Sequence, residues 1–297
     1  MKTAVILNPI AGRGKSFKKW ADIKQELIAH EVAFQAFFTE KQGHALELTR
    51  WLQKKGYSQL LVAGGDGTLH EVINGLDLSK DITIGVIPTG TGNDFARSIK
   101  PRLDVKQAVK IIAQGKSKLI DLGQVNDKRF INISGVGFDA EIAKEVNTKL
   151  RFVKGRLAYL FALVKVLALY KCRPVDIYVN GGMLTKNILF LAVANAPYVG
   201  GGMKIVPDAV INDGVFHICL AFDTSKLDIL STLPRVYNGS HISHPKVMTI
   251  KADEVKLVSK YPFAVHADGE LIGTLPATFK LLPQVLKVFV PGDGDGK

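Results

Sequence analysis

The sequence is poor in cysteine, proline and tryptophan, and it has no apolar segment of membrane-spanning length. Its 297 residues include 2 cysteines, 12 prolines and 2 tryptophans. Cys172 and Cys219 show neither the spacing of a metal site nor that of a disulfide framework, and the N-terminus "MKTAVILNPI" has no signal-peptide pattern. These absences exclude a disulfide-stabilised secreted domain and favour a protein of the reducing cytoplasm.

The formal net charge of +12 raises the question of a nucleic-acid partner. The positive charge is spread over both halves of the chain and forms no basic tail, so no nucleic-acid binding is expected. A local excess lies within residues 144–173, which contain one acid, Glu145, and the following basic residues: Lys144, Lys149, Arg151, Lys154, Arg156, Lys165, Lys171 and Arg173.

This basic region contains the apolar stretch "LAYLFALVKVLALY", residues 157–170. As a helix it would rise about 21 Å, which is too short for a hydrocarbon core of about 30 Å. We therefore expect no transmembrane span. Two interpretations stay open: a buried helix under a solvated basic loop, or a cationic apolar surface that rests on anionic lipid at the inner face of the membrane.

The order of the expected elements divides the chain into two domains. Residues 1–121 alternate the strands "TAVILN", "VAFQAFF", "SQLLVAG" and "ITIGVIP" with helices near 15–30, 44–55, 69–76 and 105–114. This alternation is typical of a parallel sheet with helices on its faces. Residues 122–283 contain short β-rich runs between Asn, Gly, Asp and Pro, with a helical insertion at about 140–171, and predict an antiparallel β domain. The final segment, 284–297, is a candidate to complete the first domain, and a ligand cleft is expected between the two.

The stretch "GGDGTLHE", residues 64–71, lies between an expected strand and an expected helix. Glycines allow close backbone approach, so Gly64, Gly65 and Gly67 can present N–H groups at the start of a helix, where anions bind. Thr68 and Glu71 have the spacing of a capping box. Taken alone, the stretch is either a tight turn with a good cap or a phosphate-binding loop.

Two similar stretches favour phosphate binding. "NPIAGRGKS" follows the first strand at residues 8–16, and "IPTGTGNDFA" follows the fourth at residues 87–96. Open parallel sheets bind ligands at this edge of the strands. A Walker A motif is excluded because Pro9 stands where its first glycine would be, and "GGDGT" lacks the G-x-G-x-x-G spacing of a dinucleotide fold. The carboxylate of Asp66 in a phosphate loop suggests a divalent cation.

Together with "INDGVF" and "HADGE", these stretches resemble the diacylglycerol kinase catalytic-domain family, in particular the soluble bacterial lipid kinases. The resemblance runs from about residue 1 to about residue 290. It implies a nucleotide-binding α/β domain, related to that of the NAD kinases, followed by an antiparallel β-sandwich domain, with the active site between them. This α/β plus β-sandwich fold agrees with the change in sequence texture near residue 121.

The resemblance also implies site residues. Contacts to ATP are expected from the following residues: Asn8, Pro9, Gly12, Thr39, Gly64, Gly65, Asp66, Gly67, Thr68, Leu69, His70, Thr91, Asn93 and Asp94. The family usually has asparagine where this chain has His70, which puts a side-chain amide contact at that position in doubt but leaves the backbone contacts in place.

Two acidic stretches lie in the β domain. "VINDGVF", residues 210–216, reads as a hairpin with an Asp-Gly turn, whereas the resemblance implies a structural Mg²⁺ held by the Asp213 carboxylate and the carbonyls of Val210 and Val215. "HADGELIG", residues 266–273, reads either as a turn or as an extended segment with the carboxylates of Asp268 and Glu270 on one face. The resemblance implies that this motif provides the general base, for which we favour Glu270, with Asp268 as a metal ligand or the alternative base.

The function that the resemblance implies is an ATP- and Mg²⁺-dependent lipid kinase. It would phosphorylate the hydroxyl of diacylglycerol or a related lipid at the membrane surface, giving a phosphatidic-acid-type product. An NAD kinase or a sphingoid-base kinase is an alternative on the same fold. A non-catalytic module that binds nucleotide or acidic lipid is an alternative of another class. The sequence leaves the oligomeric state open, a homodimer included.

Overall fold

The computed structural model describes residues 1–138, 140 and 170–292 and divides into two compact units. Unit 1 comprises Met1–Leu122, Gly200–Gly202 and Pro283–Lys297, and unit 2 comprises Gly123–Val199 and Met203–Leu282. The expected helical insertion and the basic apolar region lie, up to residue 169, outside the described residues. No helix within the described ranges is both long enough and apolar enough to cross a membrane.

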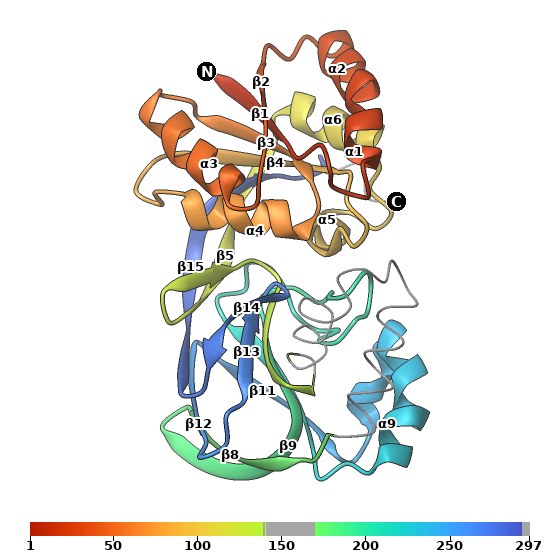
Figure 1. Cartoon of the computed structure of the whole chain (residues 1–297), viewed down its shortest axis with the longest axis vertical. Helices are drawn as coiled ribbons and strands as arrows, with labels where there is room; N and C mark the ends of the chain where they lie inside the picture. The colour runs from red at the N-terminus through yellow and green to blue at the C-terminus, as the bar shows by residue number, and fades with distance from the viewer. Residues whose placement is uncertain (139, 141–169, 293–297) are drawn as a thin grey trace. The chain divides into compact units, whose positions relative to one another are not determined.

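Unit 1 is built on a parallel sheet, as the alternating pattern predicts. Its strands are β1 (Thr3–Leu7), β2 (Gln35–Phe38), β3 (Gln59–Gly64) and β4 (Thr83–Pro88). The end of the long strand β15 (Ala277–Phe289) pairs in parallel with β4, which gives the order β15-β4-β3-β1-β2 (Figure 1). All five residues of β1 are buried, as is usual for a parallel strand covered by helices on both faces.

Helices cover both faces of this sheet. One layer contains α2 (Trp20–Ala29) and α6 (Val105–Gln114), whose apolar side chains pack on alternate residues of β1, β3 and β4. Two further helices, α3 (His44–Lys54) and α4 (Asp66–Gly75), pack against each other (Figure 1). The short helices α1 (Lys15–Lys18) and α5 (Asp94–Ile99) follow β1 and β4. The sequence pattern did not predict α5, because six residues are too few to show a helical period.

Unit 2 is an antiparallel sandwich-like fold, and this prediction is also confirmed. One row of strands runs β11 (Val247–Ala252), β10 (Phe216–Phe222), β9 (Gly182–Ala194), β7 (Ile133–Gly137), β13 (Ala264–Ala267) and β14 (Glu270–Thr274). A second row runs β9, β8 (Arg173–Val179), β12 (Glu254–Val258), β15, β5 (Ser117–Val125) and β6 (Lys128–Phe130). Strand β9 belongs to both rows, because its first half pairs with β8 and its second half with β7 and β10.

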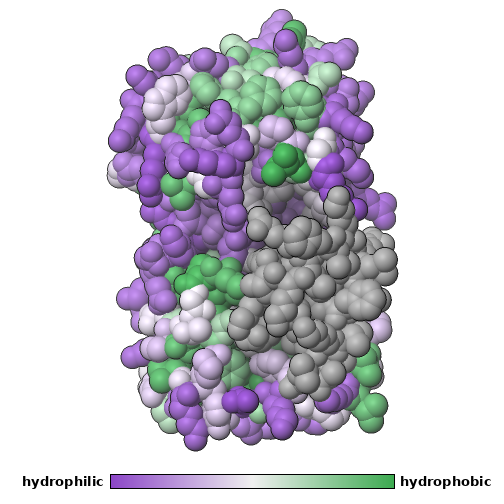
Figure 2. Space-filling view, viewed as in Figure 1, coloured by the Kyte–Doolittle hydropathy of each residue, from purple (hydrophilic) through white to green (hydrophobic). Residues whose placement is uncertain are grey.

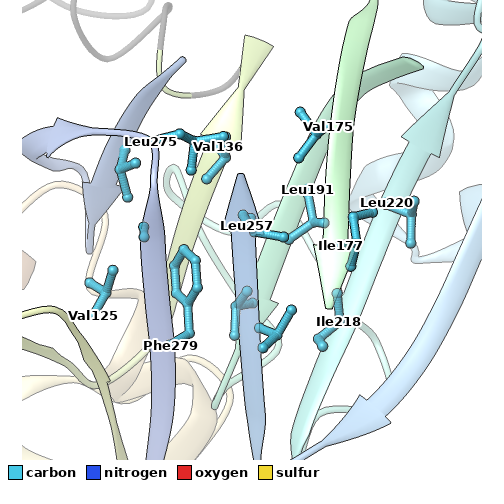
Figure 3. Close-up of a cluster of buried hydrophobic side chains, with 14 of the residues drawn as sticks. Val125, Val136, Val175, Ile177, Leu191, Ile218, Leu220, Leu257, Leu275 and Phe279 are labelled. Atoms are coloured by element: carbon cyan, nitrogen blue, oxygen red, sulfur yellow. The ribbon is translucent and has the colours of Figure 1, made fainter. Parts of the chain in front are cut away.

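The core of unit 2 is formed by side chains from both rows of strands. Figure 3 shows Val136, Leu191 and Phe279 pointing into this common cluster. Phe130 and Phe216 stack within it, with ring centroids 5.7 Å apart. Cys219 lies on β10 and is fully buried, and burial raises the pKa of its thiol to about 12. It therefore acts as a small apolar side chain.

On the face that Figure 2 shows, groups of hydrophobic residues are interspersed with hydrophilic ones among the residues that the structure describes. Beyond the strands, unit 2 contains α9 (Lys226–Thr232) and the 3₁₀ helices η1 (Leu233–Tyr237) and η2 (Ser240–Ser243). The sequence pattern did not predict these helices.

Candidate functional site

The carboxyl ends of β1, β3 and β4 meet at one edge of the unit 1 sheet. Leu7 pairs with Ala63, and Gly64 pairs with Pro88. The three glycine-containing stretches that follow these strands therefore start side by side. Main-chain hydrogen bonds join them, since Asn8 donates its N–H to Ala63 O at 3.0 Å and Thr89 donates its N–H to Gly64 O at 3.0 Å.

Helix α4 begins immediately after β3, with Gly65 as its N-cap in an extended conformation. The first residue of the helix is Asp66, three positions earlier than the sequence pattern suggests, and Leu69 donates its N–H to Gly65 O at 3.1 Å. The N–H groups at the start of a helix have no acceptor within the helix, and the helix dipole makes this end positive. The end of β3 thus presents a place where a phosphate can bind.

Gly65 and Gly90 bring two of the loops into backbone contact. A Cβ at Gly90 would lie 2.4 Å from the Cα of Gly65, closer than any real side chain allows. The N–H of Gly90 donates to Asn93 Oδ1 at 3.0 Å, and Asn93 donates its side-chain amide to Gly90 O at 3.0 Å. These contacts hold the "TGTGN" stretch against the start of α4.

The loop after β1 closes against the same structure. Gly12 has a φ of +58°, and a Cβ there would lie 2.3 Å from Thr89 O. Asn8 donates its side-chain amide to Thr68 Oγ1 at 3.0 Å. Both the left-handed backbone and the missing side chain are needed at Gly12, so any other residue there would displace this loop.

Two aspartates join the helices at this edge. Asp66 Oδ1 accepts the N–H of Asp94 at 2.7 Å and so caps the start of α5. The carboxylate of Asp94, whose side chain is 7% exposed, accepts the N–H of Gly201 at 2.9 Å and lies 3.9 Å from the Nε of Arg97. The sequence marked the glycine-rich stretch 198–209 only as a surface loop or a wall of the acceptor pocket, and it did not connect Gly201 or Arg97 to the loops of unit 1, because no local pattern does so.

The expected capping box between Thr68 and Glu71 is wrong. Because α4 starts at Asp66, Thr68 is the third residue of the helix, and its hydroxyl accepts a hydrogen bond from Asn8. Glu71 instead accepts the N–H groups of Gly43 at 2.8 Å and Ala45 at 3.0 Å. It therefore caps the neighbouring helix α3, a tertiary role that spacing within α4 does not reveal.

We expect Glu71→Ala to lower the free energy of unfolding by about 1–3 kcal/mol, because it leaves two amides at the start of α3 without their acceptor. Urea unfolding followed by circular dichroism measures this loss. Thr68→Ala should add to it independently, within about 0.5 kcal/mol, since the two side chains have different partners. A coupling free energy between the two substitutions well above about 0.5 kcal/mol would instead indicate that Thr68 and Glu71 form a capping box.

The remaining nucleotide candidates of unit 1 differ in exposure. Thr39 follows β2, is 9% exposed and donates its N–H to Leu7 O at 2.9 Å. Leu69 and His70 are buried, and the ring of His70 approaches the side-chain amide of Asn74 at 3.4 Å. Thr91 is exposed. The other nucleotide candidates, in the stretches 8–12, 64–68 and 93–94, lie together at the ends of β1, β3 and β4.

In unit 2, the segment before β10 contains no strand, so the hairpin interpretation of residues 210–216 is wrong. The Asp213 carboxylate lies 2.8 Å from Nε2 of His217, which is buried on β10. The structure describes no cluster of three His, Cys, Asp or Glu side chains suited to a metal in the ranges that it covers. A carboxylate with the carbonyls of Val210 and Val215 is an all-oxygen set, which fits a hard cation that keeps several waters.

Asp268 and Gly269 form the tight turn between β13 and β14, with φ angles of 49° and 87°. Two left-handed residues are typical of a type I′ hairpin, so the turn interpretation is confirmed and the extended one is wrong. Asp268 and Glu270 therefore do not project from one face of an extended strand. Its carboxylate accepts the N–H groups of Ile131 and Asn132, each at 2.9 Å, and of Ile133 at 3.2 Å. Glu270 is half-buried at the start of β14.

The α/β unit with glycine-rich strand ends and the antiparallel β unit are each matched by a family model of kinase domains. Residues 2–125 match the family described as diacylglycerol kinase catalytic domain, and residues 132–290 match the YegS C-terminal NAD kinase beta sandwich-like domain. A diacylglycerol kinase of Staphylococcus carnosus is 35% identical, covering 98% of this chain and 96% of the relative. One from Bacillus subtilis is 33% identical, covering 98% and 97%.

A solved structure from Bacillus anthracis has the same fold, with a TM-score of 0.79 and 25% identity over 98% of this chain and 97% of that one. The chain belongs to the diacylglycerol kinase family, and it is a lipid kinase.

Proposed function

We propose that this protein transfers the γ-phosphoryl group of ATP to the hydroxyl of diacylglycerol or a related lipid, giving a phosphatidic-acid-type product. The observation that carries the proposal is the arrangement at the strand ends of unit 1. There, α4 begins directly after Gly65, and Gly65 lies in close backbone contact with Gly90, so two glycine-rich loops meet at the positive end of a helix. The similarity of the whole chain to diacylglycerol kinases supports the lipid acceptor.

The residues of unit 1 bind the nucleotide in this proposal. The N–H groups at the start of α4, at Asp66, Gly67 and Thr68, bind phosphate oxygens. The loop from Asn8 to Gly12, Thr39, and the stretch from Thr91 to Asp94 complete the nucleotide site. The glycines fit this role because a Cβ at position 12 would collide with Thr89 O and one at position 90 with the Cα of Gly65, so side chains there would push the loops apart.

A divalent cation, Mg²⁺ in this proposal, neutralises the phosphates when it is bound. Asp66 is the carboxylate nearest the open end of α4 in sequence, and it keeps Asp94 in place by capping α5. A second, structural Mg²⁺ in unit 2 would be held by Asp213 and the carbonyls of Val210 and Val215. Its role would be to fix the segment that leads into β10.

We assign the general base to Glu270 and a positioning role to Asp268. A base must have a carboxylate oxygen available to accept the hydroxyl proton of the lipid. The Asp268 carboxylate already accepts three main-chain N–H groups, and these hydrogen bonds hold the turn from which Glu270 starts β14. Glu270 thus takes the proton, and Asp268 fixes the backbone that carries it.

A release assay for ADP with diacylglycerol, sphingosine and NAD in parallel tests the proposal. We expect ADP with diacylglycerol and a phosphorylated lipid in its mass spectrum. ADP formed only with NAD, or only with sphingosine, would assign the alternative kinases. Nucleotide binding without ADP in any reaction would identify a non-catalytic module and overturn the proposal.

The pH profile of Asp268→Asn separates the two carboxylates. We expect this variant to have a lower melting temperature and a lower kcat, because an amide nitrogen would face main-chain donors. The ascending limb of log kcat against pH should nevertheless remain, since the base is still present. Loss of that limb in Asp268→Asn with an unchanged melting temperature would instead make Asp268 the base.

A further inference from the structure

Helices α9 and η1 form one continuous helical stretch on unit 2, from Lys226 to Tyr237. Its inner side is anchored to the unit. Ile229 and Leu233 pack against a buried cluster of Phe138, Leu189 and Ala221. These inward-facing apolar residues therefore hold the stretch against unit 2.

The outer side of the same stretch is also apolar. Leu227 is 77% exposed, Leu230 is 54% exposed and Tyr237 is 61% exposed, and Pro234 is exposed between them. Positions 227, 230 and 234 recur with the period of an α-helix, and 234 and 237 are one turn apart in a 3₁₀ helix. These four side chains, here called the apolar stripe, thus lie along one side of the stretch.

An apolar stripe on both sides of a helix is unusual at a protein surface. Single exposed apolar residues are common and need no explanation, but an aligned set marks a surface that binds something. A helix that is apolar all round is usually covered all round. The inner side of this stretch is covered by unit 2, so we expect the outer side to bind a second apolar surface.

The exposed charged residues within the helical stretch itself are basic, namely Lys226 and Arg235. The exposed acid Asp223 lies just before the stretch, and its carboxylate accepts a hydrogen bond from the side-chain amide of Asn187 at 3.0 Å. Asp228 is only partly exposed, and it accepts hydrogen bonds from Lys246 at 2.6 Å and from the N–H of Ser225 at 2.8 Å. The hydrogen bond from the Lys246 ammonium, with those from Ser225, holds the pKa of Asp228 well below its usual range, so its charge stays matched by that lysine.

We propose that the apolar stripe, with Lys226 and Arg235 beside it, is a docking surface for an anionic lipid bilayer. Leucines that insert at the headgroup boundary, a tyrosine with an amphipathic ring and flanking basic residues are the composition of interfacial helices. A stable protein interface needs roughly 800 Å² and 20 residues or more on each partner, which is more than four side chains provide.

This inference rests on the proposed function, because a kinase whose acceptor lies in a bilayer has to bind that bilayer. It assigns a lipid contact to residues 227–237, in addition to the basic region at 144–173. That region also contains an expected lipid contact, but one that lies, up to residue 169, outside the described residues.

Sedimentation with vesicles tests the docking surface. The full-length protein is mixed with vesicles of phosphatidylcholine alone and of phosphatidylcholine with phosphatidylglycerol. The test variant is Leu227→Ser with Leu230→Ser. The matched control is Ile28→Ser with Met183→Ser, which removes two apolar side chains that are each 59% exposed elsewhere. Melting temperatures confirm that all proteins are folded.

We expect the wild type to bind anionic vesicles at least tenfold more tightly than neutral ones. The stripe variant should lose roughly tenfold of that affinity, whereas the control should stay within about twofold of the wild type. Lys226→Ser with Arg235→Ser should reduce the preference for anionic lipid. Equal vesicle binding by the wild type and the stripe variant would overturn the inference. So would a wild-type dimer that the stripe variant converts to monomer without a change in vesicle binding, since a second copy would then cover the stripe.

Activity on a short-chain diacylglycerol in solution separates this inference from the proposed function. We expect the stripe variant to phosphorylate the soluble acceptor at the wild-type rate, because docking is not needed there. Loss of activity toward that acceptor in the folded variant would place the stripe in the catalytic machinery and overturn its assignment as a docking surface. A wild type that binds vesicles but forms no ADP would leave the docking surface standing and refute the kinase proposal.

Discussion

Replacement of Glu270 by Gln lowers kcat by roughly 10²–10⁴-fold and leaves nucleotide binding unchanged. This range is what a positioned general base contributes to a reaction. Gln keeps the size of the side chain at the start of β14 but cannot take the proton of the lipid hydroxyl. Single-turnover transfer from ATP to diacylglycerol measures the chemical step, and calorimetric titration with ATP measures binding.

Glu254→Gln is the matched control for this experiment. Glu254 is an exposed acid of the same unit, on β12, and pairs with Lys280 at 3.3 Å. Its replacement should leave kcat within about twofold, because surface ion pairs contribute little. Full activity of Glu270→Gln would remove Glu270 from the mechanism, and an equal loss in both variants would point to a general effect on unit 2.

Gly90→Ala weakens ATP binding at least tenfold. The added methyl carbon would lie 2.4 Å from the Cα of Gly65 and 2.8 Å from Asn93 Oδ1. The first of these neighbours is backbone and cannot move away as a side chain can, so the two loops must separate. Overpacking of this kind costs about 1–3 kcal/mol. The cost falls on the start of α4, where the phosphates bind in our proposal.

Gly182→Ala is the control for the glycine experiment. The nearest atom to an added methyl carbon there is Val179 O at 3.6 Å, an ordinary contact. We expect normal ATP binding by calorimetry and a melting temperature close to that of the wild type. Normal ATP affinity in Gly90→Ala would show that the contact of Gly65 with Gly90 does not shape the nucleotide site.

Much of unit 1 could be predicted from sequence because its signals are local. Buried parallel strands read as short apolar runs, and glycines, Asn and Thr mark the turns that follow them. The alternation of strands and helices was sufficient to predict a parallel sheet, although not the order of its strands. Strand β15 was less predictable, since its first residues pair with β12 and its last with β4.

The errors arose where tertiary contacts replace local partners. The spacing of Thr68 and Glu71 suggests a capping box, but Glu71 caps the start of α3, where the amides that it accepts lie 28 and 26 residues earlier in the chain. The spacing of Asp268 and Glu270 suggests two carboxylates on one face of an extended segment, but Asp268 lies in a turn and its carboxylate accepts the amides of residues 131–133. A single sequence contains no signal for such distant donors.

The exposed stripe on α9 and η1 shows a third limit. Its leucines alternate with inward-facing apolar residues, so the sequence shows only a short apolar segment. The structure separates the two sets, because Ile229 and Leu233 pack inward whereas Leu227 and Leu230 are exposed. Exposure, rather than composition, identifies the second set as a binding surface.

The central claim is that the main-chain amides of unit 1 hold a nucleoside triphosphate whose terminal phosphoryl group passes to a lipid hydroxyl. The most direct test uses ATP labelled with ¹⁸O on the non-bridging oxygens of its γ-phosphoryl group, with diacylglycerol as acceptor. Our account predicts a phosphatidic acid that carries the entire label in its mass spectrum. Label found only in inorganic phosphate, with the lipid unchanged, would contradict it.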